Sequence, residues 1–192
     1  MYVRYVHFGH VSNRPVCQVV HPVQHPYYEL LAADLADGDV RLRPADLKED
    51  MSFFLEWYTN PDVLFYSEGP KAMPYGPDVI ERMNKALSEI GEAYVIEVKE
   101  NGSWKPIGDA SITKDKTPIT IGAEEYWGRG IGTKVLNLLI KRAREIGLKE
   151  LKVGGIYEYN TRSMKLYSKA GFVETGRVEE DGYVSIRMEL KL

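Results

Sequence analysis

Cysteine is almost absent from this sequence, which has 192 residues and a single cysteine, Cys17. No disulfide can therefore form within the chain, and a reducing compartment such as the cytoplasm is expected. The N-terminal residues lack a signal-peptide pattern, and no run of about 18 apolar residues is long enough to span a membrane. Lysine and arginine number 25 against 28 aspartates and glutamates, so the net charge is −3. Without a basic excess, we expect a cytoplasmic protein that binds neither nucleic acid nor a membrane.

Residues 1–38 differ in composition from the rest of the chain. They contain all four histidines, and prolines interrupt two β-prone runs, which predicts two short strands with loops. A short helix is expected over residues 27–36, ending at Gly38. His7 and His10 do not have the spacing of a zinc site and the cysteine is distant, so we predict no metal site. Two interpretations of this N-terminal extension stay open: an added sheet, or an element through which two copies form a homodimer.

Residues 39–192 are predicted to form one domain of strands and helices. After a strand at residues 40–44, apolar periodicity and capping signals predict three helices that begin near Asp46, Pro61 and Pro77. The following strands and helices are expected at 92–100, 105–115, 117–125, 133–147, 148–159, 160–171 and 172–190. Asn101-Gly102 and Asp181-Gly182 are hairpin turn signals within this region. The order of elements predicts an α/β (α+β) fold, with a mixed sheet and helices on its faces.

Three glycines, Gly128, Gly130 and Gly132, alternate with other residues just before the long helix. Their spacing fits neither a Walker loop, nor a dinucleotide-binding loop, in which Thr133 would have to be glycine. A third interpretation fits better: the main-chain N–H groups of residues 128–133 and the positive end of the helix dipole form an anion site. A tight packing turn without a ligand is the alternative.

A polar face follows on the next helix. Asn160, Ser163, Met164 and Tyr167 are spaced at i, i+3, i+4 and i+7, so one face carries an amide, a hydroxyl and a phenol. By itself such a stripe is typical of a solvated surface. Because it comes one strand after the anion loop, we interpret it as the second wall of a cleft.

Residues 125–177 resemble the core of the GNAT acyltransferases, which use acetyl-CoA. The loop resembles their (Q/R)-x-x-G-x-(G/A) pyrophosphate motif, with Trp127 where Gln or Arg is most common, and residues 160–172 match N-x-x-S-x-x-L-Y-x-x-x-G-F. The resemblance extends over about residues 39–190, and it is to the branch that acetylates ribosomal-protein N-termini and aminoglycosides at the 6′ amine. It implies a mostly antiparallel sheet of six to seven strands, splayed between the fourth and fifth.

The resemblance also implies where coenzyme A binds. The pantetheine arm would pair with the main chain of residues 121–124, and the pyrophosphate would lie on the N–H groups of the glycine loop. The implied cofactor-binding residues are Ile121, Gly122, Ala123, Trp127, Gly128, Arg129, Gly130, Ile131, Gly132, Thr133, Lys134, Asn160, Ser163 and Tyr167.

Tyr167 occupies the family position of the group that protonates the departing thiolate. A phenol with a pKa near 10 can give a proton to a thiolate whose acid has a pKa near 8.5. Asn160 is expected to orient cofactor or water. For the base that deprotonates the amine we favour Glu124, at the end of the fourth strand, where Glu124 and Glu125 should point to opposite faces. Glu158 on the fifth strand is the rival.

The acceptor side is expected to include aromatic and acidic groups, namely Trp57, Tyr58, Tyr66, Glu68 and Glu158. Such groups suit a cationic amine, so the resemblance implies an N-acetyltransferase acting on a small aminoglycoside-like amine or a protein N-terminus. A module that binds acetyl-CoA for regulation or as a scaffold, without catalysis, is the alternative.

Overall fold

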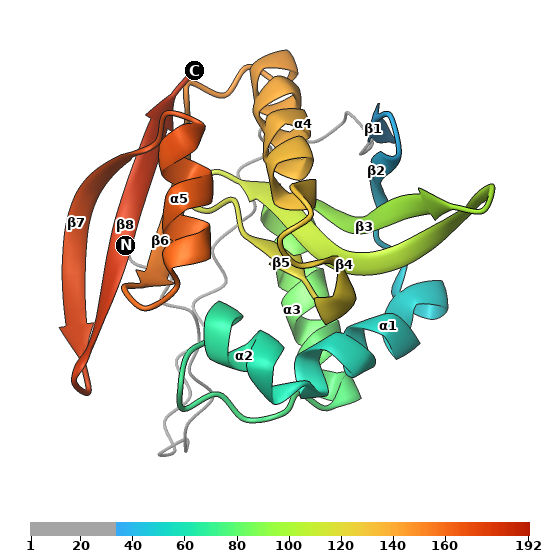
Figure 1. Cartoon of the computed structure of the whole chain (residues 1–192), viewed down its shortest axis with the longest axis horizontal. Helices are drawn as coiled ribbons and strands as arrows, with labels where there is room; N and C mark the ends of the chain where they lie inside the picture. Colours follow the sequence, from blue (N-terminus) through green and yellow to red (C-terminus); the bar gives the residue numbers. More distant parts are fainter. Residues whose placement is uncertain (1–33) are drawn as a thin grey trace.

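The computed structural model describes residues 34–192 (Figure 1). The strands, loops and histidines expected in the first 33 residues, together with Cys17 and the start of the expected helix, lie outside the described residues. Two sheets and five α-helices make up the described part.

The larger sheet contains β1 (Leu35–Asp37), β2 (Val40–Pro44), β3 (Gly91–Glu100), β4 (Ser103–Thr113) and β5 (Ile119–Ile121), in that order across the sheet. Each neighbouring pair is antiparallel. Asn101 and Gly102, between β3 and β4, have φ angles of 50° and 84°. Both lie in the left-handed region, as the predicted two-residue hairpin requires.

The helix expected over residues 27–36 is wrong where the structure describes it, because residues 35–36 belong to strand β1. Gly38 turns the chain with a φ angle of 62°, and Leu35–Asp37 then pairs with residues 40–42. Helix propensities differ by less than about 1 kcal/mol per ordinary residue, so pairing with an adjacent strand overrides them.

The smaller sheet contains β6 (Glu150–Tyr157), β8 (Tyr183–Lys191) and β7 (Val173–Glu180), in that order. Helix α5 (Thr161–Lys169) connects β6 to β7, and Asp181 and Gly182 form the predicted turn with φ angles of 56° and 79°. Both pairings in this sheet are antiparallel.

The predicted splay is confirmed at the junction of the two sheets. Strand β5 is the last strand of the larger sheet and β6 is the first of the smaller one, and the two are not paired with each other. Figure 1 shows the β6–β8–β7 sheet and α5 on one side of the molecule and the larger sheet on the other. The described strands number eight rather than six to seven, because the short β1 adds to those expected.

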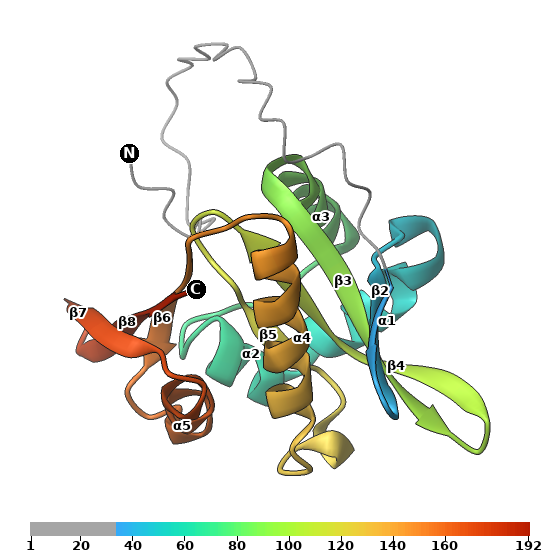
Figure 2. The same ribbon diagram turned by 90° about the horizontal axis from the view of Figure 1, so that it is seen from above.

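Helices cover both faces of the larger sheet. Helices α1 (Leu47–Thr59), α2 (Pro61–Ser67) and α3 (Pro77–Ile90) precede β3, whereas α4 (Ile131–Glu145) follows β5. Figure 2 shows α3 and α4 on opposite sides of the sheet.

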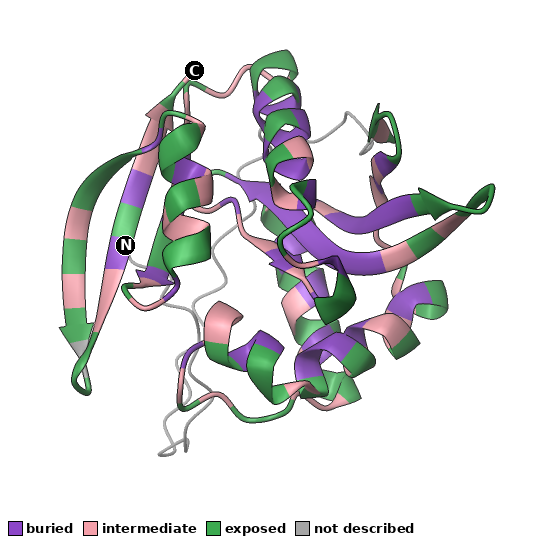
Figure 3. Ribbon diagram, in the orientation of Figure 1, coloured by how far each residue is buried: buried purple, intermediate pink, exposed green. Residues whose placement is uncertain are grey.

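Successive residues of β3 confirm this layering. Tyr94 and Ile96 pack in the core cluster that contains Val135 of α4, while Val95 packs with Phe54 of α1 and Ile80 of α3. Burial is accordingly concentrated in β3, β4 and α4, and β7 is largely exposed (Figure 3). Among residues 34–192, no helix combines the length and apolar character needed to cross a bilayer.

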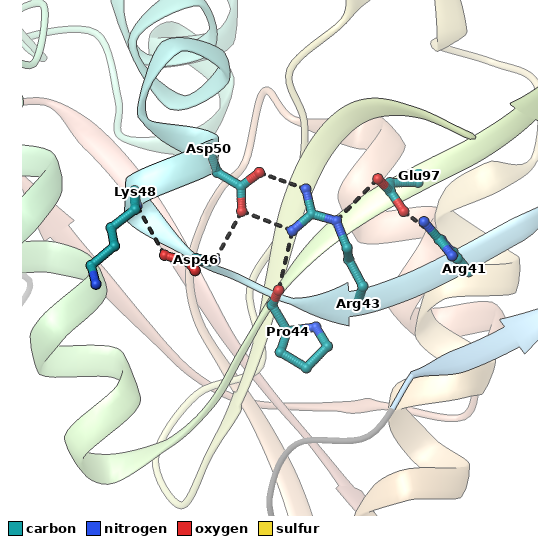
Figure 4. A network of polar contacts seen from close by, with 7 residues as sticks. All are labelled: Arg41, Arg43, Pro44, Asp46, Lys48, Asp50 and Glu97. Carbon is teal, nitrogen blue, oxygen red and sulfur yellow. Dashed lines mark hydrogen bonds and ion pairs between the residues drawn. The ribbon is translucent and has the colours of Figure 1, made fainter. Parts of the chain in front are cut away.

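A buried ion-pair network fixes the start of α1 to the sheet (Figure 4). Arg43 of β2 donates to Asp50 of α1 at 2.5 and 2.9 Å and to Glu97 of β3 at 3.1 Å. Glu97 also accepts a hydrogen bond of 2.5 Å from Arg41. The network sets the direction in which α1 leaves β2, and so the position of the residues at its C-terminal end.

Candidate active site

The glycine loop before α4 has an unusual backbone. Gly128 and Gly130 have φ angles of 76° and 79°, and Gly130 is the N-cap of α4. A Cβ atom placed on either glycine would have nothing within 4 Å. Glycine is therefore required there by the left-handed backbone and not by packing, and the space in front of the loop is open.

The N–H groups of this loop are available to a ligand. Within the described part of the chain, the N–H groups of residues 128–132 donate no hydrogen bond, whereas those of Thr133 and Lys134 bond to the Gly130 carbonyl at 3.0 and 3.4 Å. Five successive donors thus stand at the positive end of the α4 dipole, and residues 128–130 are exposed. This fits a diphosphate, because that group offers many acceptor oxygens and carries negative charge.

The third glycine serves packing. A Cβ atom on Gly132 would lie 3.3 Å from Leu166 of α5, so this position lets α4 and α5 approach closely. The pattern of three glycines therefore has two causes, backbone conformation for Gly128 and Gly130 and helix contact for Gly132.

Arg129 and Lys134, the cationic residues expected to bind the cofactor, both contact other residues of the protein. The Arg129 guanidinium lies over the ring of Tyr126, 4.9 Å from its centroid, and Lys134 is paired with Asp39 of the β1–β2 turn. Arg162, which sequence reasoning missed, lies 4.1 Å from the Trp127 ring centroid and 4.7 Å from that of Tyr66. Its place in the first turn of α5, two residues after Asn160, was the available signal.

The main chain expected to pair with pantetheine is partly used within the protein. Gly122 and Ala123 donate to the Ile107 carbonyl at 2.8 and 2.9 Å, and the Ile121 carbonyl accepts from the Trp127 indole at 2.7 Å. Within residues 34–192, no strand pairs with the second edge of β5. An extended ligand can add to such an edge.

Asn160 and Tyr167 form hydrogen bonds to residues outside α5. Asn160 is the N-cap of α5, accepting from the Ser163 N–H at 3.1 Å and donating to the Tyr66 carbonyl at 3.0 Å. The Tyr167 hydroxyl is buried and donates to the Thr117 carbonyl at 2.9 Å. Burial raises the pKa of the Tyr167 phenol, so it stays protonated. Ser163 and Met164 are partly buried on the same helix.

The carboxylates favoured from the sequence lie on the surface. Strand β5 ends at Ile121, and Glu124 and Glu125 form a short 3₁₀ helix, which corrects the expectation that they end the strand with opposite orientations. Glu124 accepts from Asn60 at 2.6 Å, and Glu125 pairs with Lys105 at 3.1 Å.

Glu158 is also exposed, and it pairs with Arg177 of β7 at 2.9 Å. The role of any of these carboxylates as a base stays a prediction.

Of the expected acceptor-side residues, Trp57, Tyr58 and Glu68 lie near one another at the C-terminal end of α1, whereas Glu158 pairs with Arg177 of β7. Trp57 is buried against Gly122, where a Cβ atom would lie 2.1 Å from its ring. The Tyr58 hydroxyl contacts both carboxylate oxygens of Asp109, at 3.0 and 3.2 Å. Glu68 accepts a hydrogen bond of 3.0 Å from Tyr75.

An aromatic cluster continues this surface toward the smaller sheet. Tyr66 and Phe65 of α2 contact Tyr159, which follows β6, with ring centroids 6.2 and 4.5 Å apart. The Tyr159 hydroxyl donates to the Phe65 carbonyl at 2.7 Å. Helix α2 therefore spans the junction between the sheets.

Asp109 is the site residue that sequence reasoning missed most clearly. It is buried, and that burial raises its pKa to about 7, with the hydrogen bond from Tyr58 lowering the pKa and the charge of Glu68 raising it. The signal available in the sequence was a lone acid within the otherwise uncharged run 106–113 of β4.

Sequence comparison supports a family assignment for most of the chain. A model of the acetyltransferase (GNAT) domain matches residues 39–173. An uncharacterised protein of Methanocaldococcus jannaschii, MJ1062, is 26% identical over 144 residues, which are 70% of this chain and 28% of the relative. The L-amino acid N-acyltransferase MnaT of Escherichia coli is 38% identical over 58 residues, 30% of this chain and 33% of the relative. The chain thus spans about a third of the length of these curated relatives.

Solved structures have the same fold. Spermidine N-acetyltransferase from Vibrio cholerae, solved with CoA and spermine, superposes with a TM-score of 0.67 at 19% identity, covering 81% of this chain and 96% of the other. The ribosomal L7/L12 acetyltransferase RimL with coenzyme A gives 0.68 at 14% identity, over 83% and 98%. Aminoglycoside acetyltransferase AAC(6')-Ib with coenzyme A gives 0.63 at 18%, over 79% and 94%.

The glycine loop, the splayed sheets and the family model agree over the larger part of the sequence. This chain belongs to the GNAT acetyltransferase family.

Proposed function

We propose that this protein is an acetyl-CoA-dependent N-acetyltransferase whose acceptor is a small cationic amine or a protein N-terminus. The observation that carries the proposal is the run of five N–H groups, residues 128–132, that have no acceptor among the described residues and lie at the start of α4. The free edge of β5 lies beside it. Together they suit a molecule with a diphosphate and an extended amide arm.

Acetyl-CoA, when bound, supplies an acetyl group as a thioester, which a neutral amine can attack. The loop residues would hold the diphosphate, and the second edge of β5 would hold the amides of the arm. Tyr167 holds a proton on its hydroxyl, which is available to the cleft once it turns from the Thr117 carbonyl. An alkylamine has a pKa of about 10.4, so the protein must also accept a proton from the acceptor.

The acceptor class is argued from charge and from relatives. Asp109 of β4 contacts Tyr58 at the end of α1, and Glu68 contacts Tyr75 in the loop after α2. Carboxylates and aromatic faces both attract cations. The Vibrio cholerae enzyme was solved with spermine, and RimL and AAC(6')-Ib are described as acting on a ribosomal protein and on aminoglycosides.

Calorimetry with acetyl-CoA tests the cofactor, and two glycine variants give a matched comparison. Gly130→Ala and Gly102→Ala both put a Cβ on a left-handed residue with nothing within 4 Å, so both should lose about 1 kcal/mol of stability. Only Gly130→Ala changes the loop, and we expect it to weaken acetyl-CoA binding by about 10-fold or more. Equal binding by the two variants, or none by the wild type, would contradict the proposal.

Release of free thiol from acetyl-CoA tests the activity. Spermine, kanamycin and a peptide with a free N-terminus represent the acceptor classes, and we expect release with at least one.

A second candidate function, a module that binds acetyl-CoA without catalysis, is favoured by one observation: the Tyr167 hydroxyl already donates to a carbonyl. Tight acetyl-CoA binding without thiol release from a broad amine panel would support the module instead.

A further inference from the structure

Tyr58 and Asp109 form a buried hydrogen-bonded pair between α1 and β4. The Tyr58 hydroxyl lies 3.0 and 3.2 Å from the two carboxylate oxygens of Asp109, and the two residues are 3% and 8% exposed. Within residues 34–192, no ion pair includes Asp109, and Tyr58 is the only residue that donates a hydrogen bond to its carboxylate. A buried carboxylate without a cation is costly, which makes a functional role a natural reason for it.

Titratable groups from two loops, α2–α3 and β4–β5, are linked to the pair directly or through Glu68. Glu68, after α2, acts on Asp109 through its charge, and the Tyr75 hydroxyl donates to Glu68. The ring of Tyr75 stacks on that of Tyr58, with centroids 5.3 Å apart and planes 3° from parallel. Lys116, in the β4–β5 loop, has a pKa lowered by burial, with Glu68 acting to raise it.

The pair adjoins the strand that has a free edge. Asp109 is opposite Thr120 of β5 in the strand register. Trp57, next to Tyr58 in α1, packs on Gly122 directly after β5. The Tyr58–Asp109 pair therefore lies on the acceptor-side face, one strand from the proposed arm site.

We propose that Tyr58 and Asp109 form a proton relay for the acceptor amine, a role that rests on the proposed function. The ammonium N–H bond breaks, its electron pair stays on nitrogen, and the proton moves to the Tyr58 phenol oxygen. The original Tyr58 O–H bond breaks at the same time, and that proton moves to an Asp109 carboxylate oxygen. The amine becomes neutral, Tyr58 is unchanged, and Asp109 becomes a carboxylic acid that later returns the proton to solvent.

The alternatives from the sequence are placed less well for this step. Glu124 and Glu158 are exposed and are held by Asn60 and Arg177. The pKa of Asp109, raised to about 7 mainly by burial, supports the relay because such a group both takes up and gives back a proton near neutral pH.

Kinetics of three variants test the relay. The assay uses the acceptor among spermine, kanamycin and the peptide that gives the fastest thiol release. With this acceptor, kcat/KM of the wild type should decrease as the pH is lowered below about 7, because Asp109 becomes protonated. Asp109→Asn should lower kcat by about 100-fold or more and remove this acidic limb, and Tyr58→Phe should lower kcat by about 10-fold or more. Tyr94→Phe, which removes a buried tyrosine hydroxyl from another carboxylate, Glu92, is the matched control and should keep kcat within about 3-fold.

Carboxyl ¹³C NMR of the protein without any ligand gives a readout independent of activity. Asp109 should titrate near pH 7, and Tyr58→Phe should shift its midpoint upward because the hydrogen bond that lowers the pKa is lost. Tyr94→Phe should leave the midpoint unchanged.

Different results overturn different conclusions. A wild-type midpoint below about 5, or Asp109→Asn with the wild-type rate and acidic limb, overturns the relay alone. If the wild type releases thiol with none of the amines, the proposed function fails and the relay with it. Circular dichroism and acetyl-CoA calorimetry check that each variant is folded; should Asp109→Asn not fold, Tyr58→Phe and the NMR titration decide.

Discussion

Two buried tyrosine–carboxylate pairs in this protein differ in what else contacts the carboxylate. Tyr94 of β3 donates to Glu92, and Arg142 of α4 gives Glu92 three further hydrogen bonds of 2.7, 3.0 and 3.2 Å. Tyr58 donates to Asp109, and within residues 34–192 no cation pairs with that carboxylate. We call the Tyr94–Glu92 pair balanced, because the charge of Arg142 compensates its carboxylate, and the Tyr58–Asp109 pair unbalanced, because no described cation does so.

The other buried carboxylates follow the balanced pattern. Asp50 and Glu97 both accept from Arg43 in the network of Figure 4. Burying a carboxylate costs several kcal/mol unless a partner compensates, so these arginines stabilise the fold. Asp109 is the exception among the buried carboxylates of the described residues, and it lies beside the proposed cleft. The contrast separates carboxylates that hold the structure from the one to which we assign proton exchange.

Removing the cation from the balanced pair should have the largest effect. Arg142→Met leaves Glu92 and Tyr94 buried without their partner, and the free energy of unfolding should fall by about 3 to 5 kcal/mol. Urea denaturation measures this, with the exposed neighbour Lys141→Met as control, which should change by less than about 0.5 kcal/mol. A loss as small as the control's would mean that the two pairs do not differ as described.

The unbalanced pair should make stability depend on pH. The folded pKa of Asp109 is raised from 3.8 to about 7, so the folded state binds its proton more tightly and the wild type loses stability as pH rises through this window. At 1.36 kcal/mol per unit, the loss is at most ~4 kcal/mol. Asp109→Asn should lack this loss relative to the wild type, measured by urea denaturation between about pH 4 and 8. Asp115→Asn, at an exposed position of the β4–β5 loop, should keep the wild-type profile.

A third buried tyrosine extends the comparison, because its hydroxyl donates to a carbonyl. Tyr167→Phe should lower turnover by about 10- to 100-fold and leave acetyl-CoA affinity nearly unchanged, since in the proposed function the hydroxyl supplies a proton and not a binding contact. Steady-state kinetics and calorimetry measure the two quantities. Ser168→Ala, exposed on the same helix, should have wild-type kinetics. Unchanged turnover in Tyr167→Phe would leave this residue a packing role only.

The smallest effect is expected for the tyrosine of the balanced pair. Tyr94→Phe removes one hydrogen bond from a carboxylate that keeps Arg142, so the free energy of unfolding should fall by about 1 kcal/mol. Thermal denaturation measures this, and a loss comparable to that of Arg142→Met would show that the tyrosine, not the arginine, compensates Glu92.

Local signals predicted the elements on which the site depends. Asp46 and Asn60 cap α1 and α2 and Pro77 is the first residue of α3, as their sequence contexts indicate, whereas α4 begins at Ile131, two residues before the expected start. Such caps are read correctly because their hydrogen bonds join residues only two to four positions apart. That the loop before α4 binds an anion stays a prediction.

The sequence did not predict which carboxylates are buried near the proposed cleft and which are exposed. Glu124 looked like the end of a strand, yet β5 stops at Ile121 and Glu124 is held by Asn60, 64 positions away. Asp109 looked like an ordinary strand residue, because its partner Tyr58 is 51 positions distant. Which carboxylate is buried depends on contacts between distant segments, and these leave no periodic signal.

The sequence by itself determined the order of helices and strands from residue 40 onward, the two-residue hairpins and the glycine turn before α4, since backbone preference and capping act over a few residues. Only the tertiary structure decided that Leu35–Asp37 is a strand, that the favoured glutamates lie on the surface and that Asp109 is buried with no cation paired to it among residues 34–192. The physical reason is that burial and charge compensation are properties of the assembled core. The pKa of a carboxyl group therefore follows from what the fold packs around it.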